Sequence, residues 1–172
     1  MDSPQWLFEG RRVRVERVVQ VTPDGTGHER EVIRHPGAVT VLPLSEDGRV
    51  CLIRNYRVAV EQTLYELPAG TLEPGEDPRE TARRELAEET GYRADAIEKL
   101  AEFYTTPGVL DEVMHLYLAT GLTAGPMRLE SGEDIEPQAV PWDEALAMAR
   151  DGRIRDAKTL VGLLFYETFR RR

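Results

Sequence analysis

One segment of this chain predicts a short helix that carries three glutamates on one side. At 100° per residue, Glu85, Glu88 and Glu89 fall within an arc of roughly 100°. Like charges at this spacing normally destabilise a helix. The same side holds Ala82 and Leu86, so we expect it to lie against the body of the protein. An acidic helix face is more often simply solvated, and the alternative is a hard divalent cation that compensates the charge.

The residues around this helix favour the cation. Asp77 and Pro78 suit the cap and the first position of a helix, and Gly91 suits its left-handed end. Upstream, residues 67–75 are rich in glycine and proline, so the chain can turn back there and bring a backbone carbonyl close to the carboxylates. We therefore expect a strand, a loop and a helix, with oxygen ligands from both the loop and the helix.

Residues 70–92 resemble the Nudix box at every fixed position. The matching residues are Gly70, Glu76, Arg84, Glu85, Leu86, Glu88, Glu89, Gly91 and Tyr92. Tyr92 is the soft match, because an aliphatic residue is commoner there. The resemblance implies an α/β fold, the α/β/α sandwich of the Nudix family with a mixed sheet, and a hydrolase of nucleoside diphosphate derivatives.

The same resemblance implies a metal centre. Its ligands would be the Ala69 carbonyl, Glu85 and Glu89, with Glu88 as a further ligand or as the residue that orients water. The cofactor would be two or three Mg²⁺ ions, with Mn²⁺ or Zn²⁺ as alternatives. Structural support is expected from Gly70, Glu76 and Arg84. In particular, an ion pair between Arg84 and Glu76 would brace the loop against the helix.

Length and composition limit the remaining classes of protein. At 172 residues and 41% hydrophobic, the chain can bury one good core. A net charge of −9 argues against a partner bound through a broad basic surface, so no nucleic acid is expected. The single cysteine, Cys51, lies in an apolar run and is expected to be a buried thiol. With no signal pattern or membrane span in the sequence, we expect a cytoplasmic protein that does not bind membranes.

The apolar pattern predicts an N-terminal β subdomain at residues 1–36, with a small antiparallel sheet, and a Nudix hydrolase domain at 37–172. The strands are expected at 11–20, 31–34, 38–44, 50–56, 97–105, 112–120 and, more weakly, 135–140. Two helices are expected after them, at 142–150 and 157–170. We interpret this order as a mixed sheet between helical layers.

The sequence outside the box resembles the ADP-ribose pyrophosphatase branch of the family. The resemblance rests on the stretches 31–39, 54–57, 65–70 and 156–159 and on Pro107-Gly108. It implies Mg²⁺-dependent hydrolysis of ADP-ribose to AMP and ribose 5-phosphate. The alternatives are another nucleoside diphosphate derivative, such as a nucleotide sugar or a dinucleotide, and a module that binds ADP-ribose without cleaving it.

Several residues are candidates for binding this substrate. They are Arg57, Glu66, Arg34, Glu31, Pro107, Gly108 and Glu112. Arg57 offers a planar fork to phosphate oxygens, and Glu66 either binds the nucleoside or pairs with Arg57. The branch often supplies an aromatic residue for the base just before Glu31, where this chain has Arg30. Arg30 could stack by its guanidinium plane, or Tyr56 or Phe8 could replace it.

The catalytic candidates are Glu133, Glu136 and Glu88. Residues 130–136 form an acidic loop with a glycine, flexible enough to close over a substrate, and Glu133 is the preferred base with Glu136 next. The branch commonly forms homodimers that exchange N-terminal sheets. A homodimer is therefore expected here.

Overall fold

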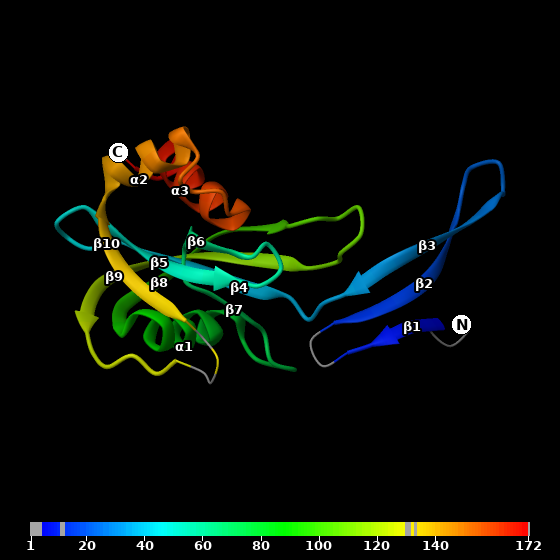
Figure 1. Ribbon diagram of the computed structural model, residues 1–172, viewed down its shortest axis with the longest axis horizontal. Coiled ribbons are helices and arrows are strands. Elements are labelled where there is room, and N and C mark those ends of the chain that lie inside the picture. Colours follow the sequence, from blue (N-terminus) through cyan, green and yellow to red (C-terminus); the bar gives the residue numbers. More distant parts are fainter. Residues whose placement is uncertain (1–4, 11–12, 130–131, 133, 172) are drawn as a thin grey trace.

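The computed structural model describes residues 5–10, 13–129, 132 and 134–171. Its N-terminal part is an antiparallel sheet in the order β1-β2-β3, formed by β1 (Gln5–Glu9), β2 (Arg14–Val21) and β3 (Gly27–Arg34). Figure 1 shows this sheet extending to one side of the rest of the molecule. Its chain continues into the body at β4, which begins at Ala38.

Two further sheets form the body. The mixed sheet has the order β7-β4-β9-β8, in which β4 and β9 are parallel and the other pairs are antiparallel. Its strands are β4 (Ala38–Pro43), β7 (Ala69–Thr71), β8 (Tyr92–Tyr104) and β9 (Val113–Ala124). The antiparallel sheet β10-β5-β6 consists of β5 (Arg49–Arg57), β6 (Gln62–Glu66) and β10 (Ile135–Pro141).

Helices cover both sides of these sheets (Figure 1). Helix α1 (Pro78–Thr90) lies on one side, and α2 (Trp142–Asp151) and α3 (Ala157–Phe169) lie on the other. Strand β4 shows why both layers are needed, because successive side chains point to opposite faces. Val39 and Val41 pack with Leu86 of α1, whereas Leu42 packs with Leu163 of α3. The expected α/β/α sandwich with a mixed sheet and an additional N-terminal antiparallel sheet is confirmed.

The elements differ from the expectations in several places: β3 and β8 begin earlier than predicted, at Gly27 and Tyr92, and β9 ends later, at Ala124. Strands β1 and β6 were not separately expected, and the segment predicted as a loop at 67–75 contains the short strand β7. Glycine disfavours a strand by itself, but Gly70 pairs with Val39 of the buried strand β4, and tertiary pairing overrides the local preference. None of the described helices is long and apolar enough to cross a bilayer.

Candidate active site

Helix α1 presents its glutamates beside strand β7. The helix begins with Asp77, which accepts a hydrogen bond from the Arg79 amide at 2.7 Å, and ends at Gly91 with φ 73°. Glu89 is only 3% exposed, and its carboxylate accepts a hydrogen bond from the Ala69 amide at 2.9 Å. The loop-to-helix approach expected from the sequence is therefore present. The contact with Glu89 is made by the amide of Ala69, while its carbonyl was the expected metal ligand.

Gly70 lies directly against the carboxyl group of Glu85. A Cβ at this position would overlap the carboxyl carbon and both carboxylate oxygens. Glycine therefore permits this close approach, because any side chain would have to displace the Glu85 carboxylate. Glu85 itself is 12% exposed. The close approach holds one acidic residue of α1 at the surface of β7.

Arg84 donates four hydrogen bonds, of which two join the helix to the preceding loop and two stay within the helix. Its Nε and Nη2 donate to the two carboxylate oxygens of Glu76 at 3.1 and 3.2 Å. Its Nη1 donates to Glu85 at 2.7 Å and to Glu88 at 2.9 Å. The bonds from Arg84 lower the pKa of Glu76, and the pKa of Arg84 is raised in return. The structure thus shows the expected brace between Arg84 and Glu76, and it adds both neighbouring carboxylates to the same guanidinium.

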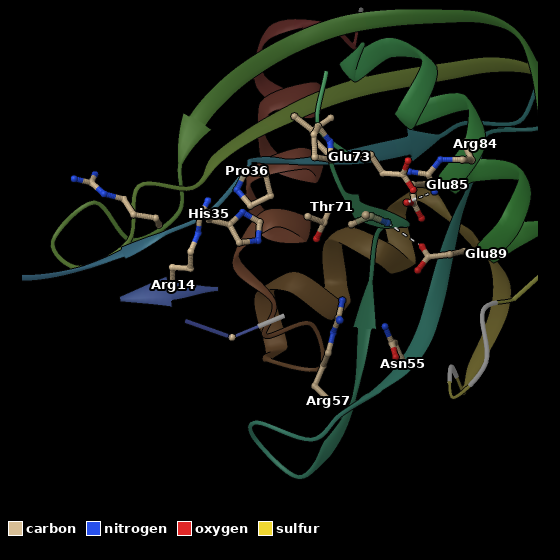
Figure 2. Close-up of a pocket in the computed structure, with 16 residues that line it drawn as sticks. Arg14, His35, Pro36, Asn55, Arg57, Thr71, Glu73, Arg84, Glu85 and Glu89 are labelled. Carbon is tan, nitrogen blue, oxygen red and sulfur yellow. Dashed lines mark hydrogen bonds and ion pairs between the residues drawn. The ribbon is translucent and has the colours of Figure 1, made fainter. Parts of the chain in front are cut away.

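A cleft of about 610 Å³ opens beside these residues (Figure 2). Its walls come from the N-terminal sheet, the β3–β4 connection, β5, the β7 region and α1. The lining residues are Gly10, Arg14, Arg34, His35, Pro36, Asn55, Arg57, Ala69, Gly70, Thr71, Leu72, Glu73, Pro74, Arg84, Glu85 and Glu89. One wall carries carboxylates, and the opposite side carries arginines and a histidine. This division of charge suits a ligand that is itself anionic and is bound with cations.

Arg57 projects into the cleft from the end of β5 (Figure 2). Its Nε and Nη2 donate to the two oxygens of Glu66 at 2.8 and 2.6 Å. Of the two roles considered for Glu66, the structure shows the ion pair, and the Glu66 side chain is 1% exposed. Burial favours a higher pKa for Glu66, but the bonds from Arg57 and the charge of Lys158 outweigh it and lower the pKa. Glu66 therefore stays ionised behind Arg57.

Asp111 fixes the second basic group of the cleft. Its carboxylate accepts hydrogen bonds from Arg34 Nη1 at 3.0 Å and from the His35 amide at 2.8 Å. Arg34 also donates to Glu16 of β2 at 2.6 Å. These bonds raise the pKa of Arg34, with Glu16 as the larger cause. The N-terminal sheet is thereby connected to the body where the chain enters β4.

Comparison with known proteins agrees with this geometry. Residues 34–161 match the model of the NUDIX domain, which is most of the chain. The chain belongs to the Nudix family. It is 40% identical over 167 residues to the ADP-ribose pyrophosphatase of Bacillus subtilis, covering 96% of this chain and 90% of that protein. It is also 39% identical over 163 residues to the methanol dehydrogenase activator of Bacillus methanolicus, covering 94% of this chain and 88% of that protein.

Two further relatives show the range of the family. The GDP-mannose pyrophosphatase of Cronobacter sakazakii is 39% identical over 158 residues, covering 82% of each chain. A solved structure described as an ADP compounds hydrolase superposes with a TM-score of 0.81 at 23% identity, covering 97% of this chain and 94% of that one. At this identity the structural likeness shows the fold. Together with the sequence relatives, the family match identifies the chain as a Nudix hydrolase.

Several predicted residues lie outside the lining of the Nudix cleft. Pro107 and Gly108 are exposed in the turn between β8 and β9. That turn lies beside β3, where the Ile33 amide donates to the Val109 carbonyl at 2.8 Å. Glu112 accepts a hydrogen bond from the Thr105 hydroxyl at 2.7 Å. Their role in binding substrate stays a prediction.

The remaining candidates lie on other strands or in an undescribed part of the chain. Glu31 is exposed on β3, opposite Arg17 of β2. Glu136 lies on β10 and pairs with Arg54 at 2.9 Å. Glu133, the preferred base, lies outside the described residues. Arg30, which stands where an aromatic residue is common, donates to Gln20 at 3.1 Å on the exposed surface of the N-terminal sheet.

Sequence reasoning missed part of the cleft wall. Arg14 lies 4.8 Å from the centroid of the Trp6 ring, a cation–π contact between β2 and β1. Asn55, Thr71 and Glu73 also line the cleft. Alternation along β2 could have placed Arg14 on one face of the sheet, but no pattern indicated that this face turns toward the Nudix box.

The donors present are those that a hard divalent cation prefers, namely carboxylates and a backbone carbonyl. Within the described part of the chain, no three acidic, histidine or cysteine side chains already form a metal-binding group. Arg84 instead bonds to Glu85 and Glu88. The carboxylates nevertheless fit a cation. Because Gly70 has no side chain, the Glu85 carboxylate can lie at the cleft wall, close to the backbone of β7.

Proposed function

We propose that this Nudix hydrolase cleaves the diphosphate of ADP-ribose and releases AMP and ribose 5-phosphate. The observation that carries the proposal is the cleft in which the carboxylates of α1 lie across from Arg57 and Arg14 (Figure 2), with Arg34 also in its lining. ADP-ribose pyrophosphatases from Bacillus subtilis and Mycobacterium tuberculosis, 40% and 36% identical to this chain, support the choice of substrate. A diphosphate needs cations on both sides, and this cleft offers arginines on one side and acidic metal ligands on the other.

The arginines bind the substrate and orient it. Arg57 is held by Glu66 in a fixed plane, so the rest of its guanidinium can meet phosphate oxygens without losing much side-chain entropy. Arg34 is held by two separate carboxylates, with its Nε bonded to Glu16 and its Nη1 to Asp111. Two prearranged guanidinium groups would bind the diphosphate in the cleft that Glu85 and Glu89 of α1 also line.

Glu85, Glu89 and the Ala69 carbonyl would hold Mg²⁺, with Glu88 as a further ligand. The bound cation would supply charge stabilisation to the diphosphate and lower the pKa of water. Glu85 and Glu88 would have to leave Arg84 when they bind it, while Glu76 keeps Arg84 in place. Hydrolysis adds water across one P–O–P bond, so one phosphate gains the hydroxyl and the other leaves with the bridging oxygen. Glu133 would take the proton from the attacking water, with Glu136 as the alternative.

A homodimer is part of the proposal. The N-terminal sheet exposes Phe8, Val19 and Val21 to 56%, 61% and 67%. The sheet also extends away from the body (Figure 1), so a second copy can reach it. Burying these side chains in a partner would remove apolar surface from water.

A substrate panel tests the proposal. ADP-ribose, GDP-mannose, a CMP-linked phosphonate and NAD would be compared by kcat/KM with Mg²⁺, Mn²⁺ or Zn²⁺ present. The expected result is the highest kcat/KM for ADP-ribose with Mg²⁺, with AMP and ribose 5-phosphate as products. Preference for another compound would reassign the substrate. Binding of ADP-ribose without release of AMP under all three metals would indicate a sensing module.

A further inference from the structure

Lys158 is a buried lysine that the proposed reaction does not use. It is the second residue of α3 and is 8% exposed. Its Nζ lies 2.6 Å from Glu66 Oε2 and 3.0 Å from Asp156 Oδ2. Burying an ammonium group is costly unless it is paired. Both carboxylates close to it therefore contribute to holding the lysine at this point.

Asp156 fixes the position of the lysine along the helix. It caps α3 by accepting hydrogen bonds from the Thr159 amide at 3.0 Å and from the Thr159 hydroxyl at 2.6 Å. The Thr159 hydroxyl in turn accepts a hydrogen bond from the Leu67 amide at 2.7 Å. The first turn of α3 is thus joined to the chain that leads from Glu66 into β7, and the lysine cannot shift without that turn.

Glu66 connects the lysine to the cleft. Its Oε1 accepts from Arg57 Nε, and its Oε2 accepts from both Arg57 Nη2 and Lys158 Nζ. The two bonds to Arg57 fix the plane of the guanidinium. The bond to Lys158 fixes the carboxylate from the opposite side. The result is a continuous series of charged contacts from the start of α3 to Arg57 in the cleft.

We propose that Lys158 is a positioning residue for the hydrolysis, which it serves by holding Glu66 so that Glu66 presents Arg57 to the diphosphate. The expected effect of Lys158 on activity rests on the proposed function. Lys158 also shares the negative charge of Glu66. Without it, Arg57 would be the sole cation bonded to a buried carboxylate and would be drawn toward it. With it, Arg57 keeps attraction for a phosphate anion.

A double-mutant cycle distinguishes positioning from direct contact. Lys158→Met is expected to raise KM for ADP-ribose about tenfold with a smaller change in kcat, and Arg57→Met to raise it at least as much. If Lys158 acts through Arg57, the double variant has the KM of Arg57→Met alone. The proposal would be overturned if the increase in KM of the double variant equalled the product of the two single increases. An unchanged KM in Lys158→Met would also overturn it.

The control is the other lysine of the chain. Lys99 also pairs with a glutamate at 2.6 Å, Glu102, but on the exposed surface of β8. Lys99→Met should leave KM unchanged. Lys158→Gln keeps a hydrogen-bond donor without the charge, so it replaces Lys158→Met in the cycle should the methionine variant not fold.

A second readout does not depend on the substrate. The Arg57 Nε–H signal in a ¹⁵N NMR spectrum, assigned by its loss in Arg57→Met, reports the bond to Glu66. It should shift in Lys158→Gln and stay in place in Lys99→Met. A shifted signal in a protein that cleaves no ADP-ribose would refute the proposed substrate and keep the positioning role. An unshifted signal would refute the positioning role whatever the substrate is.

Discussion

Gly70 and Glu85 lie in direct contact across the junction of β7 and α1, with no room for a methyl group between them. Gly70→Ala should therefore displace the Glu85 carboxylate and lower kcat by at least about tenfold, with a matching loss of Mg²⁺ affinity. Steady-state kinetics and calorimetric titration with Mg²⁺ would measure both. Gly27→Ala is the matched control, because its Cβ meets only the Val19 side chain at 3.1 Å on the N-terminal sheet.

Glu85→Gln and Glu89→Gln test the proposed metal ligands. Each change removes one negative charge but keeps the shape of the side chain, so the fold should survive. We expect each to lower kcat by more than about a hundredfold, or about 3 kcal/mol of barrier. Circular dichroism would confirm folding. Activity equal to that of the wild type in either variant would contradict the assignment.

Glu133→Gln and Glu136→Gln compare the two proposed bases. A group that takes a proton from water acts in the chemical step, so Glu133→Gln should lower kcat much more than it changes KM. Glu136 pairs with Arg54, so Glu136→Gln should have the smaller effect. Rapid-quench kinetics would separate chemistry from product release. The opposite order of the two variants would move the base to Glu136.

Cys51 should be inert in the folded protein. Burial raises the pKa of its thiol from 9.0 to about 12. Alkylation by iodoacetamide at a pH of about 8.5 should therefore be slow when folded and fast in denaturant. The thiol's pKa is higher in the folded protein than in the unfolded chain. The stabilisation that comes from keeping this thiol protonated is therefore complete below pH 9 and is lost as the pH rises toward about 12. Mass spectrometry would follow the alkylation, and equally fast labelling in both states would contradict it.

Val19 and Val21 lie on one side of β2 and are exposed to 61% and 67%. If a partner covers the N-terminal sheet, the double change of both valines to lysine should convert a dimer to a monomer at micromolar concentration. Light scattering after size exclusion would measure the mass. Leu164→Lys on α3, where the leucine is 52% exposed, is the control. A wild-type protein that is already monomeric would refute the dimer.

The local features of the Nudix box were predictable because they depend on residues close in sequence. Asp77 and Gly91 cap α1 as expected, and Arg84 pairs with Glu76 within the same segment. Strand β7 was not predictable, since it forms only by pairing with β4. The same limit applies to Glu66. The residues next to Glu66 in the sequence did not indicate whether it contacts the substrate or forms an ion pair, because Lys158 reaches it from a helix far along the chain.

The sequence by itself determined the family, the acidic face of α1 and its two ends, since spacing along a helix sets which side chains share a face. It also determined that one cysteine lies in the core. Tertiary structure decided what faces that acidic surface. It brought Arg14 and Arg34 from the N-terminal sheet and Arg57 from β5 into the lining of the same cleft. Pairing of strands far apart in the chain creates that wall, and such pairing leaves no periodic signal in any single segment.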